Sequence, residues 1–262
     1  MNYITTNHRG GIGNAMFKLA ASVSLAMDNN VEYMFSTEFI RPVDPNYQTY
    51  YNNLLRGFKF IETLPPTYHT YNEPKFSYTD IPYTKGTDLL LDGYFQSENY
   101  FINNKETIIN LFKPTNEIKE SIIKDIPNIQ EYVSIHIRRG DYLNYPDHHP
   151  QQSLEYYKKA IDNFGVDRTY IIFSDDLEGV KDIFSFLPNK LFYTSGKDWL
   201  DLYIMSLCEH NIICNSTFSW WAAYLNENPN KVITAPKKWF GSAYTQHDTS
   251  TLMPKEWLII NE

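Results

Sequence analysis

Residues 131–142 carry the clearest hydrophobic pattern in the chain. Val133, Ile135 and Ile137 alternate with polar residues, which is the two-residue period of a β-strand with one buried face. We therefore predict a strand over residues 132–138. Two arginines, a glycine and an aspartate follow this strand directly, so polar residues lie at its carboxyl end.

The sequence after this strand alternates regularly between strand-like and helix-like segments. The further predicted strands are 169–174, 191–194, 211–214 and 232–235, and the predicted helices are 153–164, 176–186, 198–209 and 217–226. Strands separated by helices in this way predict a parallel, doubly wound sheet. Ligands of such sheets bind beyond the carboxyl ends of the strands, so the residues at those ends are the first candidates for a functional site.

The first part of the chain predicts a second, less regular α/β region. A strand over 2–7 is followed by a glycine-rich turn and by a helix with apolar residues at helical spacing. Further strands are predicted at 31–36 and 89–95, and a helix is predicted to begin after Ser97 as its N-cap and to end at Phe112. Between these strands, the many prolines and tyrosines interrupt the chain too often for long elements.

A short amphipathic helix over 118–125, flanked by Pro114 and Pro127, marks the predicted domain boundary. The 262 residues are enough for two modest domains with ample core. We expect an N-terminal α/β domain over 1–125 and a C-terminal Rossmann-like domain over 126–262.

Composition narrows the classes of partner. The formal net charge of −8 gives no general reason to expect nucleic acid or an anionic membrane surface, so any anion must be held by a local cluster. No run of 18 apolar residues occurs, and the first residues lack the apolar core of a signal peptide, so we expect neither a transmembrane segment nor export. The spacing of Cys208 and Cys214 fits neither a zinc ribbon nor a redox Cys-x-x-Cys, and we predict buried thiols in a reducing compartment.

Arg138 and Arg139 suggest diphosphate binding at the end of the strand. The fixed fork of guanidinium donors matches phosphate oxygens in a bidentate way that lysine cannot. Consecutive strand residues point to opposite sides, so only one arginine reaches a given site unless Gly140 turns the chain. The alternative is a structural ion pair between an arginine and Asp141 or another neighbour.

Three more turns carry candidate ligand-binding groups, and each also has a purely structural explanation. The candidates are Gly11 and Asn14 in the glycine-rich turn; Ser174, Asp175 and Asp176; and Asn215, Ser216, Thr217, Phe218 and Ser219. The first turn resembles a phosphate-binding fingerprint but lacks its third glycine, so a tight connection explains it as well. The other two are good helix starts, and a helix N-terminus both needs capping and attracts anions.

Four blocks of sequence together resemble a known family. They are Gly10 to Phe17, His136 to Tyr142, Phe173 to Asp176, and Asp201 to Leu225, the last of which contains Asn215-Ser-Thr-Phe-Ser-Trp-Trp221. In this order they resemble the bacterial α-1,2-fucosyltransferases, glycosyltransferases of the family 11 type that use GDP-fucose. One departure is Ala15, where the family usually has glutamine.

The resemblance implies a GT-B-like α/β fold, in which two Rossmann-like domains face each other across a cleft and the second holds GDP-fucose. It implies that Arg138 contacts the diphosphate with Arg139 in support, and that His136 and either Asp175 or Asp176 meet guanine. Ser216, Thr217 and Ser219 would complete the phosphate cradle. No cofactor or metal is expected, since the chain contains no Asp-x-Asp motif.

The expected reaction is transfer of fucose from GDP-β-L-fucose to the 2-hydroxyl of a galactose, with inversion. Inversion requires an acceptor-side base. Asp141 is the carboxylate nearest to the arginines, but pairing with one of them is an equal alternative. Asp92 and Glu98 in the first domain are further candidates and, with Gln96, are expected near the acceptor. Aromatic side chains of the proline-rich stretch offer the faces that a sugar ring needs.

Three other functions remain open from the sequence: a related transferase with a different nucleotide sugar, a nucleotide-sugar binder without turnover, and an adhesion module based on Arg139-Gly140-Asp141. The last conflicts with the buried strand before the tripeptide. We expect GDP-fucose and a β-galactoside glycan as partners, no nucleic acid, and a cytoplasmic location, at the inner face of the membrane if the acceptor is lipid-linked. Nothing in the sequence sets the oligomeric state.

Overall fold

The computed structural model describes residues 2–8, 10–37, 47–65 and 67–261. The chain forms two compact units, each of which is built from two stretches of sequence. Unit 1 consists of Met1–Lys113 and His247–Pro254, and unit 2 consists of Pro114–Gln246 and Lys255–Glu262.

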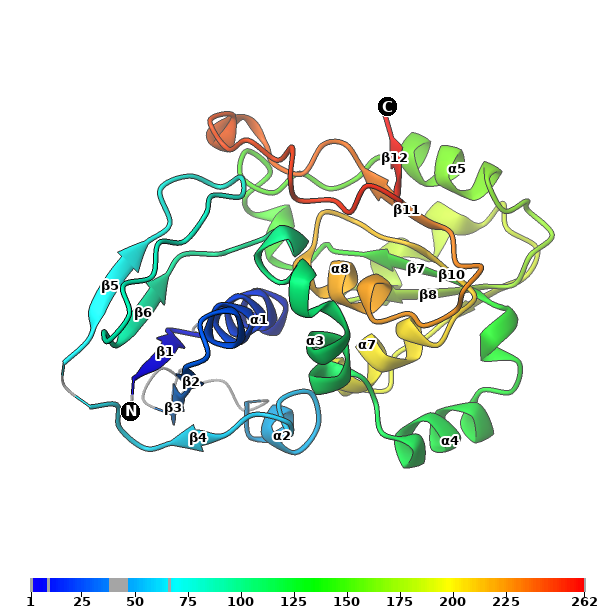
Figure 1. Ribbon diagram of the computed structural model, residues 1–262. Helices are drawn as coiled ribbons and strands as arrows, with labels where there is room; N and C mark the ends of the chain where they lie inside the picture. Colours follow the sequence, from blue (N-terminus) through cyan, green and yellow to red (C-terminus); the bar gives the residue numbers. More distant parts are fainter. Residues whose placement is uncertain (1, 9, 38–46, 66, 262) are drawn as a thin grey trace. The chain divides into compact units, whose positions relative to one another are not determined.

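Unit 1 is built around a parallel four-stranded sheet with the order β2-β1-β6-β5 (Figure 1). Its strands are β1 (Tyr3–Thr6), β2 (Glu32–Tyr33), β5 (His69–Asn72) and β6 (Leu89–Asp92), and a two-stranded sheet joins β3 (Phe35–Ser36) to β4 (Phe60–Ile61). Its helices are α1 (Ile12–Asp28), α2 (Tyr47–Asn52), α3 (Lys105–Phe112) and the 3-10 turns η2 (Glu98–Tyr100) and η3 (Ile102–Asn104). The central helix α1 follows β1 directly and is buried along most of its length.

Unit 2 contains a parallel six-stranded sheet with the order β12-β11-β10-β7-β8-β9. Its strands are β7 (Val133–Ile137), β8 (Tyr170–Ser174), β9 (Lys190–Phe192), β10 (His210–Ile212), β11 (Ile233–Pro236) and β12 (Leu258–Ile260). Its helices are α4 (Asn116–Asp125), α5 (Leu154–Asp162), α6 (Leu177–Val180), α7 (Asp198–Ser206) and α8 (Thr217–Tyr224), with the 3-10 turns η4 (Ile129–Glu131), η5 (Asp141–Leu143), η6 (Asp182–Phe184) and η7 (Ser242–Tyr244). The predicted α/β fold with parallel sheets is thus confirmed.

Helices cover both faces of the larger sheet (Figure 1). Val133, Ile135 and Ile137 face α5, whose Tyr156 and Ile161 complete a fully buried core on that side. The opposite face carries α7 and α8 and contains polar contacts: Ser134 Oγ accepts a hydrogen bond of 2.7 Å from Asn211 Nδ2. The alternation seen in the sequence therefore separates an apolar face from a more polar one.

Several elements differ from the sequence prediction. The helix predicted to begin after Ser97 and to end at Phe112 is divided into η2, η3 and α3, because Phe101 leaves the helical backbone (φ −142°, ψ 13°) and buries its ring completely. The Ser97 cap does occur, since its side chain accepts from the Asn99 amide. The predicted helix over 176–186 is divided likewise into α6 and η6.

The division of the chain also differs from the predicted boundary at residue 125. The helix α4 lies in unit 2, where Lys119 forms an ion pair of 2.6 Å with Glu227, so unit 2 begins at Pro114. The segment His247–Pro254 is part of unit 1, because Thr251 bonds to Tyr78 and Ser97. These contacts join residues far apart in the sequence, so no local sequence pattern predicts them.

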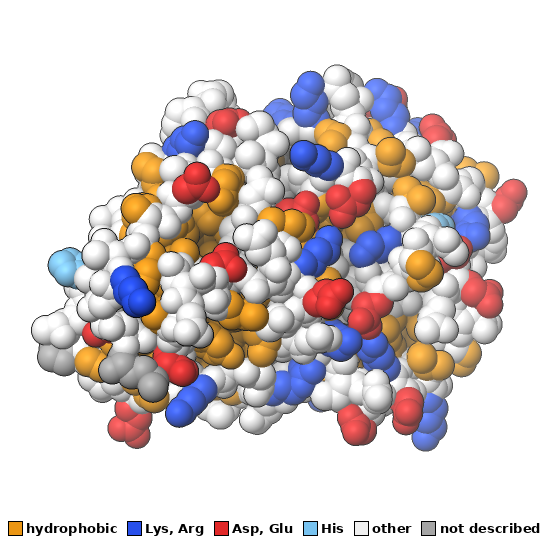
Figure 2. All heavy atoms as spheres, viewed as in Figure 1, with side chains coloured by type: hydrophobic (Ala, Val, Ile, Leu, Met, Phe, Trp, Pro, Cys, Tyr) orange, Lys and Arg blue, Asp and Glu red, His pale blue; other side chains and the backbone are white. Residues whose placement is uncertain are grey.

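On the face that Figure 2 shows, acidic and basic side chains of the described residues are interspersed. Among these residues, no helix is long and apolar enough to cross a membrane. Cys208 and Cys214 are free and buried, as predicted.

Candidate active site

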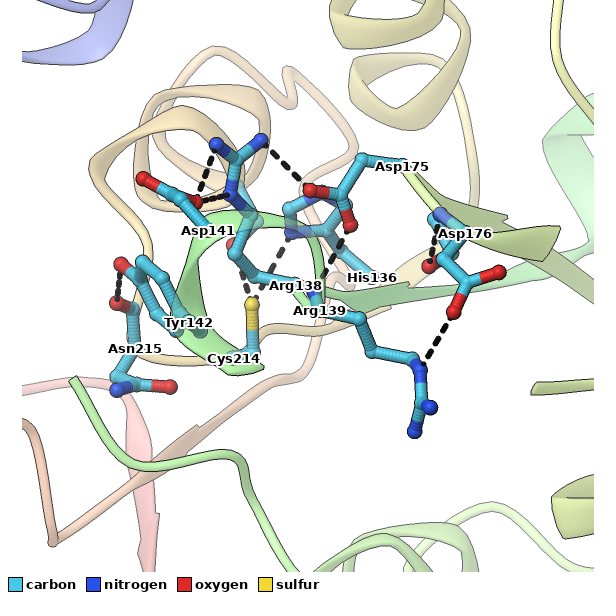
Figure 3. Close-up of polar contacts among 11 residues, drawn as sticks. His136, Arg138, Arg139, Asp141, Tyr142, Asp175, Asp176, Cys214 and Asn215 are labelled. Carbon is cyan, nitrogen blue, oxygen red and sulfur yellow. Dashed lines mark hydrogen bonds and ion pairs between the residues drawn. The ribbon is translucent and has the colours of Figure 1, made fainter. Parts of the chain in front are cut away.

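The strongest candidate site lies at the carboxyl ends of β7 and β10. These strands are neighbours, and the order of strands reverses between them, which is where doubly wound sheets bind their ligands. Arg138 follows β7 and Asn215 follows β10 closely. The Tyr142 hydroxyl donates to the Asn215 carbonyl oxygen at 2.9 Å, so the loops after the two strands are joined (Figure 3).

Arg138 is held between two carboxylates. Its Nε and Nη2 donate to Asp141 Oδ1 at 3.1 and 2.8 Å, and its Nη1 lies 3.1 Å from Asp175 Oδ2 (Figure 3). The guanidinium also lies 5.8 Å from the centroid of the Tyr142 ring. With 36% of the side chain exposed, the fork is oriented in advance and still accessible to an anion.

Arg139 points away from Arg138, as the strand period predicts (Figure 3). Its Nε donates to Asp176 Oδ2 at 2.9 Å and its Nη1 to Gln151 Oε1 at 3.1 Å. Its backbone amide donates to Asp175 Oδ1 at 2.8 Å. Arg139 therefore anchors the loop, and Asp175 links the two arginines by accepting from one backbone and one guanidinium.

Asp176 has two structural roles, as the cap of α6 and as the partner of Arg139. Its Oδ1 caps α6 by accepting from the Gly179 amide at 3.0 Å, and its Oδ2 pairs with Arg139. These hydrogen bonds, that from Arg139 first, lower the pKa of the Asp176 carboxyl below its usual value. The Asp176 backbone amide in turn donates to Ser174 Oγ at 3.1 Å, so the residues at the carboxyl end of β8 are linked to one another by hydrogen bonds.

Gly140 is required for the close approach of Asp175. A Cβ atom at this position would lie 2.2 Å from Asp175 Oδ2, which is far inside van der Waals contact. The glycine thus allows the chain to turn with the carboxylate packed against its backbone. This turn places Asp141 in reach of Arg138.

His136 is buried at the same end of β7, with only 6% of its surface exposed. Its Nδ1 lies 3.2 Å from Cys214 Sγ, and its ring centroid lies 5.4 Å from that of Phe218. Burial, and then the charge of Arg138, lower the pKa of His136 to about 3. Burial also raises the pKa of the Cys214 thiol to about 12, so this is an uncharged pair at neutral pH.

The start of α8 supplies the remaining donor-side candidates. Asn215 is a structural link, since its Nδ2 donates to the carbonyl oxygens of Pro150 and Trp239 at 2.9 and 3.0 Å. Ser216 is buried and is the N-cap residue, and Ser219 Oγ donates back to its carbonyl oxygen at 3.2 Å. Thr217 and Phe218 are half-buried in the first turn.

The candidates in unit 1 are only partly brought together. Asn14 Oδ1 accepts from Gln96 Nε2 at 3.0 Å, which links the start of α1 to the segment after β6. Gly11 is the N-cap residue of α1 and is exposed. Asp92 is exposed at the end of β6, whereas Glu98 lies in η2 with its carboxylate 3.6 Å from Lys105 Nζ.

Four residues that the sequence analysis did not select contribute to these clusters. Gln151 and Tyr142 contact Arg139 and Asn215 in unit 2, and Lys18 and Glu73 lie among the polar groups of unit 1. Tyr142 could have been found from its place in the arginine-containing block, whereas the others follow no motif. Among the described residues, no group of three or more His, Cys, Asp or Glu side chains is arranged to hold a metal ion.

Relatives found by sequence comparison include two bacterial transferases. An O-antigen biosynthesis glycosyltransferase, WbnK, from Escherichia coli is 31% identical over 184 residues, which are 64% of this chain and 59% of the relative. An α-1,2-colitosyltransferase from Escherichia coli is 31% identical over 163 residues, which are 56% of this chain and 55% of the relative. The matched regions thus span less than two thirds of either relative.

Solved structures that resemble this chain include fucosyltransferases. The fucosyltransferase NodZ from Bradyrhizobium superposes with a TM-score of 0.56 and 13% identity, covering 85% of this chain and 91% of that one. A second NodZ crystal, described as an α-1,6-fucosyltransferase co-crystallised with GDP, has a TM-score of 0.55. At this level of identity the likeness concerns the fold, and it confirms the GT-B-like architecture.

The family profile described as glycosyl transferase family 11 matches residues 2–261. This range includes all four blocks on which the resemblance was based. The chain belongs to glycosyl transferase family 11.

Proposed function

We propose that this protein transfers L-fucose from GDP-β-L-fucose to the 2-hydroxyl of a terminal galactose, with inversion and without a metal ion. The observation that carries the proposal is the Arg138 fork, oriented by Asp141 and Asp175 and partly exposed at the switch point of the unit 2 sheet. A guanidinium in this state offers paired donors to a diphosphate. The solved fucosyltransferase that was co-crystallised with GDP supports the donor class.

In this mechanism Arg138 stabilises the charge that develops on the departing GDP. Arg139, fixed by Asp176 and Gln151, holds the loop in place. The N-terminus of α8, where Ser216 is the N-cap residue and Thr217 begins the helix, adds the positive end of a helix dipole. The guanine contacts expected of His136 and of Asp175 or Asp176 stay predictions, and each of these carboxylates would share its oxygens with an arginine.

The role of Asp141 follows from its contacts. Both of its hydrogen bonds from Arg138 go to Oδ1. We therefore assign Asp141 to positioning the arginine, and we leave the base to an acceptor-side carboxylate or to a weak base in an oxocarbenium-like reaction. The acceptor is a β-galactoside glycan, and we place the reaction in the cytoplasm.

A second candidate function is transfer of a different sugar from its GDP derivative. The name of the colitosyltransferase relative favours it, because that relative forms an α-1,2 linkage with a donor other than fucose. The deciding experiment incubates the protein with GDP-fucose and a panel of β-galactosides and determines the linkage by NMR. Transfer from GDP-colitose or GDP-mannose in preference to GDP-fucose would replace the donor assignment, and absence of any product would leave a binding protein.

A further inference from the structure

An exposed tyrosine stands at the carboxyl edge of the unit 1 sheet. Tyr94 follows β6 by two residues, and 53% of its surface is exposed. Asp92, the last residue of β6, is exposed as well. An open aromatic face beside a carboxylate is the combination that binds a sugar, because the ring stacks on C–H groups while the carboxylate accepts from hydroxyls.

The turn that carries Tyr94 is held rigidly by Glu73. The Glu73 carboxylate accepts from the Tyr94 amide at 2.6 Å and from the Phe95 amide at 3.0 and 3.1 Å. The Tyr100 hydroxyl donates to the same carboxylate at 3.3 Å. Three donors on one half-buried carboxylate fix the backbone on which the exposed ring stands.

The backbone of this turn is also strained. Phe95 adopts φ +51°, which non-glycine residues avoid, and its ring is completely buried. A Cβ atom on Gly93 would lie 2.4 Å from Glu73 Cβ, so only glycine fits there. A strained backbone conformation persists only where the surrounding contacts hold it in place. Residues strained in this way are often found at ligand-binding sites.

A buried lysine lies behind the exposed pair. Lys18 of α1 donates from Nζ to the backbone oxygen and to Oδ1 of Asn7, each at 3.1 Å. The side chain of Asn7 connects Lys18 to Asp92, because its Nδ2 donates to Asp92 Oδ1 at 2.6 Å. The same Nζ lies 5.6 Å from the centroid of the Tyr94 ring. One cation therefore orients both the carboxylate, through Asn7, and the aromatic ring.

We propose that Tyr94 and Asp92 form the subsite for the acceptor sugar, with Tyr94 as the stacking platform and Lys18 and Glu73 as positioning residues. This inference rests on the proposed function for the identity of the sugar. The C–H groups on one face of a β-galactoside pack on the Tyr94 ring, and a hydroxyl of the same sugar donates to Asp92.

The test compares Tyr94→Ala, Tyr94→Phe and Asp92→Asn with wild type. A matched control is Tyr68→Ala, which removes another exposed tyrosine, 38% exposed, directly before the amino end of β5, whereas Tyr94 follows the carboxyl end of the neighbouring β6. Binding of methyl β-D-galactoside is measured by saturation-transfer NMR in the presence of GDP, and GDP affinity is measured by calorimetry. Initial rates with GDP-fucose give KM for the galactoside and kcat separately.

Tyr94→Ala should weaken galactoside binding and raise its KM about tenfold or more, which corresponds to the loss of one stacking contact and its buried area. Tyr94→Phe should recover most of this loss, and Asp92→Asn should raise KM, while GDP affinity stays at the wild-type value in all three. An unchanged galactoside KM and NMR signal in Tyr94→Ala would overturn the subsite even if wild type transfers fucose. Loss of the NMR signal in Tyr94→Ala, in a protein that does not use GDP-fucose, would keep the subsite and overturn the proposed donor.

Discussion

Asp175 Oδ2 lies 3.1 Å from Nη1 of Arg138, while the other oxygen of the same carboxylate accepts from the backbone amide of Arg139. One side chain at the end of β8 thus determines both the direction of a guanidinium and the path of the chain after β7.

Replacing Arg138 by alanine should abolish most of the turnover. If the guanidinium stabilises the departing diphosphate, its loss costs on the order of 10²-fold or more in rate. Arg138→Lys should be nearly as inactive, because one ammonium group cannot reproduce a fork held by Asp141 and Asp175. Initial rates of GDP release measure both, and an Arg138→Ala enzyme with most of its activity would refute the role.

Changing Asp141 to asparagine should weaken GDP binding and turnover together. The carboxylate accepts two hydrogen bonds from Arg138, and an amide in its place leaves the guanidinium without this charge. Calorimetry with GDP and steady-state rates separate the two effects. Unchanged GDP affinity with a much lower kcat would instead identify Asp141 as the base.

Activity should survive treatment with EDTA. The expectation comes from the missing Asp-x-Asp motif and from the arginine and helix N-terminus that would neutralise GDP. Added magnesium or manganese should raise the rate only modestly, by helping GDP to leave. Rates measured before chelation, after it, and after metal is restored decide the matter: complete loss with recovery on adding metal would show that the reaction needs the ion.

Gly140→Ala should destabilise unit 2 and weaken GDP binding. The new Cβ would lie 2.2 Å from Asp175 Oδ2, and relieving this overlap moves the carboxylate away from Arg138. We expect a loss of about 1–3 kcal/mol in the free energy of unfolding, measured by chemical denaturation. Gly11→Ala is the control: apart from the adjacent residues and the backbone of its own helix, no atom of the described residues lies within 4 Å of a Cβ at that position, so the loss should be smaller.

The stability of the fold should depend on His136 below neutral pH. Burial lowers its pKa to about 3 in the folded protein, against about 6.5 in the unfolded chain, so the unfolded state binds the proton first. The contribution of the neutral imidazole is complete above about pH 6.5 and is lost as pH falls toward 3, by at most about 1.4 kcal/mol per pH unit. His136→Gln should show a flatter dependence between pH 6.5 and 5 in urea denaturation; equal slopes would mean that the folded imidazole titrates normally.

The sequence predicted correctly those elements whose residues show a local hydrophobic period. The alternation of Val133, Ile135 and Ile137 located β7 within a residue at each end, and with it the arginines. The edge strand β12 escaped notice because Leu258 to Ile260 are exposed or half-exposed and show no alternation. The helix predicted to end at Phe112 is interrupted at Phe101, whose ring is buried against residues distant in the sequence. A local sequence pattern does not predict such burial.

The candidate sites divide in the same way. The bond between Arg138 and Asp141 spans three residues and was open to prediction, as one of two alternatives. The bonds from Tyr94 and Phe95 to Glu73 cross a long irregular connection, and only the register of β5 with β6 brings these groups together. Selecting Glu73 required the three-dimensional arrangement.

The discontinuity of unit 1 has a consequence for biosynthesis. Thr251 accepts a hydrogen bond from the Tyr78 amide at 2.8 Å and another from the Ser97 hydroxyl at 2.6 Å, so unit 1 receives these partners only after nearly all of unit 2 has been translated. As the polypeptide leaves the ribosome, the first 113 residues are present long before their last packing segment arrives. Unit 1 therefore cannot complete its folding in the order in which the chain is synthesised. In a nascent chain stalled at residue 246, the Tyr78 amide and the Ser97 hydroxyl would be exposed to solvent or to chaperones.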